Sequence, residues 1–324
     1  MYNRNYITIY FLAVVLFALT QFYLAYFAAG GIDIAVYWGE SVGIDYRNPR
    51  YYQEPVSWEI IRILATSLSR ENFVFGFSLS VLAIGIARLG FFGGLVLYAS
   101  FLSPFGVMLE FNILRQCLGT IFLIFFTLSL VRDKRWSAGL WGIMAILSHN
   151  STVVMVGFLA FIFYFSRFDR TWKFIASLAL VAFIVIMRIV GGLEVLLGSR
   201  TESFMSTIVD DGPENLVYLA FSLVFCVLLY IFSKDGKWRP IALALAISTV
   251  FTVAVALILS LDSWVYGRMA ISCVVVCHFL LAYDFWERRH VRLLDLFFVL
   301  GVMTLNGAVL FFHPGAMTMI TGRL

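Results

Sequence analysis

Long apolar blocks, separated by short charged segments, run through most of this 324-residue chain. About 20 consecutive apolar residues are enough for a helix to cross a bilayer, and the alternating pattern of a membrane β-barrel is missing. Charged residues make up 13% of the chain and hydrophobic residues 62%, whereas an ordinary soluble domain is about 25% charged. These features predict an all-α polytopic integral membrane protein and exclude soluble enzymes and nucleic-acid partners.

Breaking the chain at its charge clusters predicts about eleven transmembrane helices. The candidate spans are 7–29, 72–87, 91–109, 112–131, 136–149, 151–166, 174–190, 215–233, 240–261, 267–285 and 293–312. The fifth and sixth of these are short, and are either two tilted spans or one helix broken between them. We expect residues 1–324 to form a single transmembrane domain with external loops near 30–71 and 191–214.

Basic residues are distributed unequally between the two sides of the predicted membrane protein. The loops at 132–135, 167–173, 234–239 and 287–292 contain all four lysines of the chain. By the positive-inside rule this side is cytoplasmic, and the N-terminus lies on it. Basic residues of the external half are all arginines, which bind phosphate and carboxylate through paired hydrogen bonds. This predicts an anionic ligand on the external side.

A polar stripe marks the external end of one predicted span. Asn112, Arg115, Gln116 and Gly119 fall on one face of an otherwise apolar helix. Ionisable groups in a span usually face the bundle interior or a wet cavity. In the simpler alternative Arg115 reaches out to the lipid headgroups, but this does not explain Asn112 and Gln116. The stripe is a candidate substrate-binding face.

Two side chains near the external face are candidate proton acceptors. His149 lies in the polar run 148–151, where a span reaches that face, and histidine accepts protons near neutral pH. A hydrogen-bonded structural role is the alternative. Glu54 is the second candidate, because it precedes a proline that holds it close to the membrane surface.

The segment 55–70, directly after Glu54, is predicted to form a short amphipathic helix. We expect it to lie in the outer interface with Trp58 at headgroup level. Apolar residues repeat at helical spacing at Val56, Ile60, Ile63, Leu64 and Leu68.

Other polar and aromatic residues of the external segments are weaker candidates for ligand binding, because they also suit solvated loops. They are Asp33, Tyr37, Tyr51, Tyr52 and Arg200. Near the C-terminus, Trp264, Tyr266 and Arg268 open a predicted span on the external side, which gives a second arginine at the membrane edge with aromatic neighbours.

The four cysteines all lie within apolar blocks and are interpreted as small packing residues. Cys273 and Cys277 share a helix face beside His278, but this trio lacks the fourth ligand of a closed zinc site. No metal site is predicted.

In these features the chain resembles the EpsG/Wzy-like family of bacterial polysaccharide polymerases. The matching pieces are Asp33-x-x-x-Tyr37, Glu54-Pro55, Asn112-x-x-Arg115-Gln116, His149 followed by Ser151, and Arg268. The resemblance covers about 30–285, and its best discriminator is Asn-x-x-Arg-Gln followed by Ser-His.

The resemblance implies a GT-C-like membrane glycosyltransferase of O-antigen or exopolysaccharide biosynthesis. It would join undecaprenyl-diphosphate-linked repeat units at the external, periplasmic face of the bacterial cytoplasmic (inner) membrane. Its partners would be the lipid-linked donor and acceptor, membrane lipid and a chain-length regulator. The reaction is expected to need neither a metal nor another cofactor.

On this reading, His149 or Glu54 is the general base, and the charge of the leaving diphosphate is stabilised by Arg115, in the most direct contact, and by Arg268. Asn112, Gln116 and Tyr37 would position sugars, and aromatic residues near the loops would stack on them. An O-antigen ligase, or a transporter or flippase of lipid-linked glycan, is the alternative function.

Overall fold

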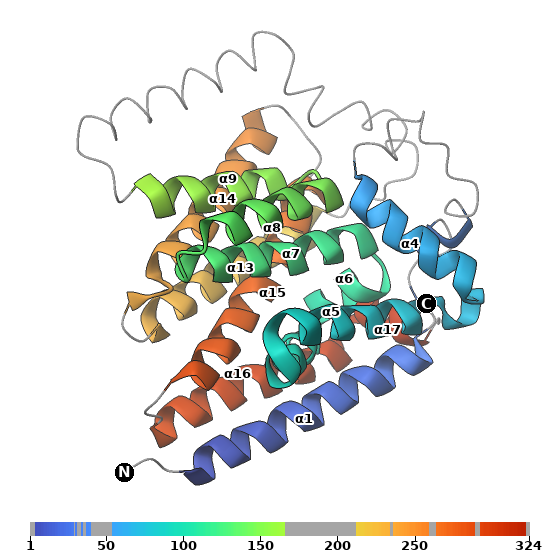
Figure 1. The fold of residues 1–324 in the computed structure, drawn as a ribbon, viewed down its shortest axis with the longest axis horizontal. Helices are drawn as coiled ribbons and strands as arrows, with labels where there is room; N and C mark the ends of the chain where they lie inside the picture. The colour runs from blue at the N-terminus through green and yellow to red at the C-terminus, as the bar shows by residue number, and fades with distance from the viewer. Residues whose placement is uncertain are drawn as a thin grey trace.

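The computed structural model describes residues 4–28, 30, 34, 37–39, 54–165, 212–233, 236–258, 264–288 and 292–321, and the regular elements in these ranges are helices (Figure 1). The helices are α1 (Arg4–Phe27), α4 (Pro55–Ser67), α5 (Arg70–Ala99), α6 (Pro104–Phe111), α7 (Leu114–Val131), α8 (Arg135–Ser148), α9 (Thr152–Phe165), α13 (Gly212–Phe232), α14 (Arg239–Ile258), α15 (Trp264–Glu287), α16 (Leu293–Phe312) and α17 (Pro314–Thr321). The predicted all-α class is confirmed for this part of the chain.

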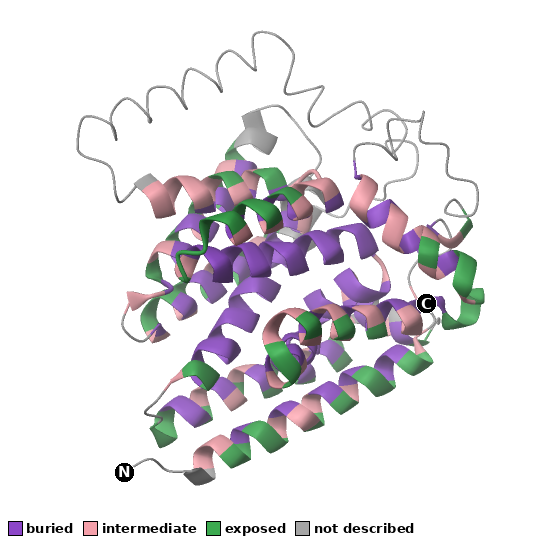
Figure 2. Cartoon of the chain, in the orientation of Figure 1, coloured by how far each residue is buried: buried purple, intermediate pink, exposed green. Residues whose placement is uncertain are grey.

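Helices α7 and α15 form the centre of the bundle. In each, 94% of the most apolar window is buried, against 28% in α1 and α5. Figure 2 shows this contrast between the buried central helices and the mixed surface of α1. Exposed apolar side chains on α1, such as Leu12, Leu16 and Leu19, suit contact with lipid rather than water.

Five described helices are long and apolar enough to cross a membrane: α1, α5, α7, α15 and α16. Helices α9, α13 and α14 are also apolar, but each contributes a shorter apolar segment. The pattern supports a multi-pass membrane protein, whereas the predicted number of about eleven spans is not established. The predicted span 174–190 lies outside the described residues, as does the external loop 191–214 except for its last three positions.

The prediction of one continuous span over 91–109 is wrong. Helix α5 ends at Ala99, and α6 begins at Pro104, whose ring removes a backbone donor and is tolerated at a helix start. Ser103 caps the new helix, since its hydroxyl accepts a 3.0 Å hydrogen bond from the Gly106 amide. Within α5, Gly90 has a φ of 77°, which interrupts the helix between the predicted spans 72–87 and 91–109.

Helices α8 and α9 pack side by side against α7. A Cβ built on Gly142 of α8 would lie 3.4 Å from the Val156 side chain of α9. Each helix is 14 residues long, which is about 21 Å and shorter than the hydrocarbon core of a bilayer. The polar run predicted as a helix break is the junction between them.

Helix α4 confirms the helix predicted in the segment 55–70, but the predicted placement of Trp58 is wrong. Trp58 is fully buried, whereas Ile63 is 52% exposed. The buried face consists of Ser57, Trp58, Ile61 and Ala65, and α4 packs on α5, α7 and α8. Trp58 turns inward because its ring covers the Arg115 guanidinium, with 5.1 Å between the guanidinium carbon and the ring centroid.

The described residues of three of the predicted basic loops gather at one end of the bundle, while the loop 167–173 lies outside the described residues. Arg132, after α7, donates to the Glu287 carboxylate at 2.6 Å and to the Tyr283 hydroxyl at 2.8 Å. Lys237, before α14, donates to the same carboxylate at 2.5 Å. Arg115 lies at the opposite end of α7, about 25 Å away along the helix. The arrangement separates the lysine-bearing end from the end that carries the polar stripe.

Candidate active site

Three side chains from distant parts of the chain form a buried cluster, here called the Glu54–Arg115–His149 cluster. Glu54 directly precedes α4, Arg115 lies in the first turn of α7, and His149 joins α8 to α9. Their exposed fractions are 1%, 6% and 8%. Two candidate proton acceptors and one candidate cation of the sequence analysis are therefore brought together.

The Glu54 carboxylate is the centre of this cluster. Its Oε2 accepts a hydrogen bond from the Arg115 guanidinium, which also forms an ion pair with it. Its Oε1 lies 3.0 Å from His149 Nδ1 and accepts a 3.1 Å hydrogen bond from the backbone N–H of Asn150. The carboxylate thus receives three contacts, one of them from a permanent cation.

Aromatic rings hold the guanidinium of Arg115 in place. Its central carbon lies 5.1 Å from the Trp58 ring centroid and 5.6 Å from that of Tyr37. The two rings contact each other edge to face, with centroids 5.7 Å apart. Cation–π contacts of this kind favour arginine over lysine, because the planar group stacks on the rings.

Two small residues set the position of His149. The Ser57 hydroxyl of α4 donates a 2.6 Å hydrogen bond to the carbonyl of Ser148, which lies in the last turn of α8, where carbonyls lack helical partners. Gly119 of α7 leaves room for the histidine, because a Cβ there would lie 3.0 Å from His149 Cβ and 3.0 Å from Thr152 Cγ2. Gly119 thus belongs to the site for steric reasons.

The surroundings separate the charge states of the two titratable groups. Burial raises the pKa of Glu54, but His149, Arg115 and the Asn150 amide outweigh it, so the pKa lies well below its ordinary value. Burial lowers the pKa of His149, with the charges of Arg115 and Arg268 acting in the same direction and Glu54 opposing them. At neutral pH the pair is an ionised carboxylate beside a neutral imidazole.

These charge states decide which ring nitrogen of His149 carries its proton. An ionised carboxylate only accepts hydrogen bonds, so His149 Nδ1 is the donor to Glu54. The lone pair then lies on Nε2. A carboxylate that orients a neutral histidine in this way is the arrangement of a general base.

Gln116 connects the first turns of α7 to α15. Its side-chain amide donates to the Arg268 carbonyl and, at 2.8 Å, to the Ser272 hydroxyl. The Thr120 hydroxyl lies 2.9 Å from the same serine. Gln116 is fully buried. Its hydrogen bond to the Arg268 carbonyl holds the backbone of Arg268 in position. Arg268 is half-buried, and its charge acts on His149.

The structure describes only some of the remaining predicted site residues. Tyr37 joins the cluster through Arg115. Asn112 is half-buried between α6 and α7, where its backbone N–H donates to the Met108 carbonyl. Tyr266 lies in the first turn of α15. The predicted residues that lie outside the described part of the chain are Asp33, Tyr51, Tyr52 and Arg200.

Sequence reasoning missed Ser57 and misplaced Trp58. Neither stands out in a chain so rich in small and aromatic residues. The only available signal was their position within one turn of Glu54, on the face opposite Val56 and Ile60.

A second buried carboxyl group lies outside this cluster. Glu110 of α6 is fully buried and accepts a 2.5 Å hydrogen bond from the Gln21 side chain of α1. Burial raises the pKa of Glu110 to about 7. The contact joins α1 to α6.

Three buried thiols form the one group of potential metal ligands found among the described residues. Cys226 of α13 has its sulfur 3.5 Å from that of Cys273 and 3.8 Å from that of Cys277, both on α15. Because the surroundings are apolar, thiolates would be costly there. The interpretation of these cysteines as packing residues stays a prediction.

The described residues thus form a multi-pass helical bundle in which a buried carboxylate–histidine pair and two arginines lie at one end. The model of the EpsG family matches residues 44–318, and the chain belongs to this family. The resemblance drawn from the sequence is thereby confirmed, and membership suggests a polysaccharide-related polymerase of glycosyltransferase type. No curated protein and no solved structure matches the chain significantly.

Proposed function

We propose that this protein polymerises polysaccharide by joining undecaprenyl-diphosphate-linked repeat units at the external face of the cytoplasmic membrane. The observation that carries the proposal is the contact of the Glu54 carboxylate with Nδ1 of a neutral His149, at the end of the bundle opposite the lysines. Family membership supplies the class of reaction.

In the proposed reaction, His149 Nε2 takes the proton of an acceptor sugar hydroxyl. The hydroxyl oxygen forms a bond to the anomeric carbon of the donor sugar, while the bond from that carbon to the diphosphate oxygen breaks. The electron pair of that bond leaves with the lipid diphosphate, and the proton stays on the imidazole until the product departs. Glu54 keeps the ring oriented and stabilises the imidazolium as it forms.

The two arginines take different roles in this mechanism. Arg115 contacts Glu54 and is almost fully buried, so we assign it first to keeping the carboxylate ionised and in place. Arg268 is half-buried beside His149 and is our choice for the group that meets the leaving diphosphate. Preorganised cations near a developing negative charge are a large source of catalysis.

The sugar-binding assignments are also part of the proposal. Asn112, between α6 and α7, and Tyr266, in the first turn of α15, are assigned to sugar binding. The predicted binding set, acting through hydrogen bonds, stacking and charge, is completed by Gln116, Tyr37, Asp33, Tyr51 and Arg200.

Reconstitution tests the polymerase directly. Purified protein in lipid nanodiscs is given synthetic lipid-diphosphate repeat units, and the products are separated by size. A ladder from the wild type, with no product from His149→Gln, supports the proposal. Transfer of a single repeat to a different glycolipid acceptor would favour a ligase, and movement of the lipid without bond formation would favour a transporter; either result would refute polymerisation.

The membrane side and the metal independence need their own tests. An impermeant thiol reagent should label single cysteines introduced at Asn48 and Gly212 from outside the cell, and failure at either site would overturn the orientation. Polymerisation should survive chelation by EDTA. Activity that is lost in EDTA and restored by magnesium or manganese would overturn the metal-independent mechanism.

A further inference from the structure

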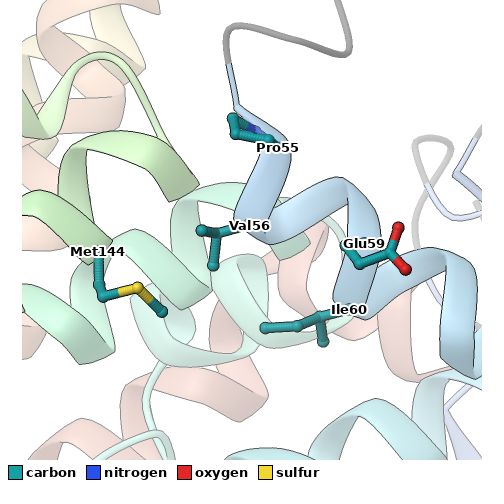
Figure 3. Close-up of a pocket in the computed structure, with 5 residues that line it drawn as sticks. All are labelled: Pro55, Val56, Glu59, Ile60 and Met144. Atoms are coloured by element: carbon teal, nitrogen blue, oxygen red, sulfur yellow. The ribbon is translucent and has the colours of Figure 1, made fainter. Parts of the chain in front are cut away.

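An apolar groove lies between α4 and α8, directly beside the Glu54–Arg115–His149 cluster. It is lined by Pro55, Val56, Glu59, Ile60 and Met144. In Figure 3, Val56 and Ile60 of α4 point toward Met144 of α8, whereas the Glu59 carboxylate points away. The facing walls are therefore hydrocarbon and thioether, which suit an apolar chain and offer little to a sugar.

The position of this groove relates it to the candidate chemistry. Its first lining residue, Pro55, follows Glu54 in the chain, and Met144 lies about one helical turn before the junction that carries His149. The cations Arg115 and Arg268 are at this same end. An anionic headgroup bound there would leave its tail beside Val56 and Ile60.

Beyond the groove, α8 presents an exposed apolar surface. Along α8, away from His149, the side chains of Ile143, Leu140 and Trp136 are 58%, 56% and 95% exposed. Several exposed apolar residues on one helix suit contact with acyl chains rather than with water. The groove thus lies between the cationic, proton-accepting end and this apolar surface of α8.

We propose that the α4–α8 groove holds the first isoprene units of the lipid-linked donor, with its diphosphate at the Arg268 end. The occupant follows from the charges at one end, the apolar walls and the exposed apolar surface of α8 beyond them. This inference rests on the proposed function and names the part of the chain that binds the donor lipid. Lipid tails are as apolar as the groove walls, so selectivity comes from shape and van der Waals contact. The groove acts by aligning the diphosphate with the catalytic groups.

A filled groove provides the kinetic test. Ile60→Trp places a bulky ring between the walls, and Leu16→Trp puts the same ring on the exposed face of α1, where Leu16 is 64% exposed. Donors with a full-length undecaprenyl chain or with an ethyl group, which lacks isoprene units, are compared, with the acceptor held constant. Ile60→Trp should lower kcat/KM about tenfold with the long donor, or about 1.4 kcal/mol, and leave the short donor unaffected. Leu16→Trp should leave both unaffected.

Equal losses with both donors, or no loss with either, would overturn the proposal and make the groove a site for bulk lipid. Sensitivity to the acceptor chain instead of the donor chain would also overturn it.

A binding test separates failure of the groove from failure of the polymerase. A photoreactive undecaprenyl diphosphate without sugar is crosslinked to the wild-type protein, and the modified peptides are mapped. Crosslinks in 55–60 and 140–147, reduced by Ile60→Trp, support the groove even if no polymer forms. Polymer formation with crosslinks mapped elsewhere would refute the groove and leave the proposed function standing.

Discussion

Replacing Glu54 by glutamine tests the proposed base most directly, because it changes charge and hydrogen bonding while it keeps the shape. The carboxylate accepts from Arg115 on Oε2, and from His149 and Asn150 on Oε1. A glutamine amide has one accepting end and one donating end. If the glutamine nitrogen faces Arg115, two hydrogen-bond donors face each other. If it faces His149, Nδ1 of the histidine must become the acceptor, and Nε2 then carries the proton. The second arrangement abolishes the base.

The size of the effect follows from the groups that are lost. A positioned general base contributes about 10²–10⁴-fold in rate, which is about 3–5 kcal/mol of barrier. Removing one partner of a buried ion pair costs about 3–5 kcal/mol of stability. This range applies without a discount for solvent, because the two side chains are 1% and 7% exposed. Glu54→Gln should therefore reduce the initial rate at least about 100-fold and lower the melting temperature.

The assay measures the initial rate of lipid-diphosphate release, the polymer ladder and the melting temperature in detergent. Glu71→Gln on the exposed first turn of α5 is the matched control and should behave as wild type. Glu54→Asp keeps the charge but shortens the reach, so it should restore most of the stability while the rate stays low. A Glu54→Gln rate within tenfold of wild type would refute the role of the carboxylate–histidine pair.

Further expectations concern the neighbours of this pair. Arg115→Lys should abolish polymer while the protein still accumulates in the membrane, because an ammonium group cannot stack between two rings; a normal ladder on a gel would contradict this. Gly119→Ala should cut the rate about tenfold or more by displacing His149, and Gly139→Ala, whose Cβ meets nothing within 4 Å, should not. Since burial lowers the pKa of His149 below its ordinary value of 6.5, kcat/KM should rise with pH with its midpoint on the acid side of that value; a rate that first rises above pH 8 would exclude this base. Burial raises the pKa of Glu110 to about 7, so ionisation of this carboxyl group destabilises the folded protein as pH rises toward that value. Glu110→Gln should therefore reduce the fall in melting temperature between pH 5 and pH 8.5. An unchanged fall would contradict the assignment.

The sequence by itself was enough for the class of protein and for the main candidate residues. Apolar runs report which segments leave water, so most helices lie close to their predicted ranges, as α1, α7 and α16 do. Polar residues in apolar surroundings are costly unless they have partners. For this reason Arg115 and His149 stood out without any knowledge of their contacts.

Which residues meet was decided only in three dimensions. Glu54 joins residues 61 and 95 positions away, and neither hydropathy nor spacing encodes such a contact. The hydrogen bonds of Gln116 to α15 could not be read from the sequence either, and its role in sugar binding stays a prediction. The turn between α5 and α6 carries no charge, so dividing the chain at its charge clusters passed over the capping Ser103 and Pro104.

The burial of Trp58 shows why the sequence alone did not reveal the buried face of α4. In a soluble protein, apolar periodicity marks the face that turns away from solvent. In a membrane protein, lipid is as apolar as the core, so the apolar residues at Val56, Ile60 and Ile63 did not show which face of α4 is buried. That face was decided by the cation of Arg115 and the carbonyl of Ser148, which bind Trp58 and Ser57. Apolar sequence therefore determined that α4 leaves water, and polar contacts from other helices determined how it is turned.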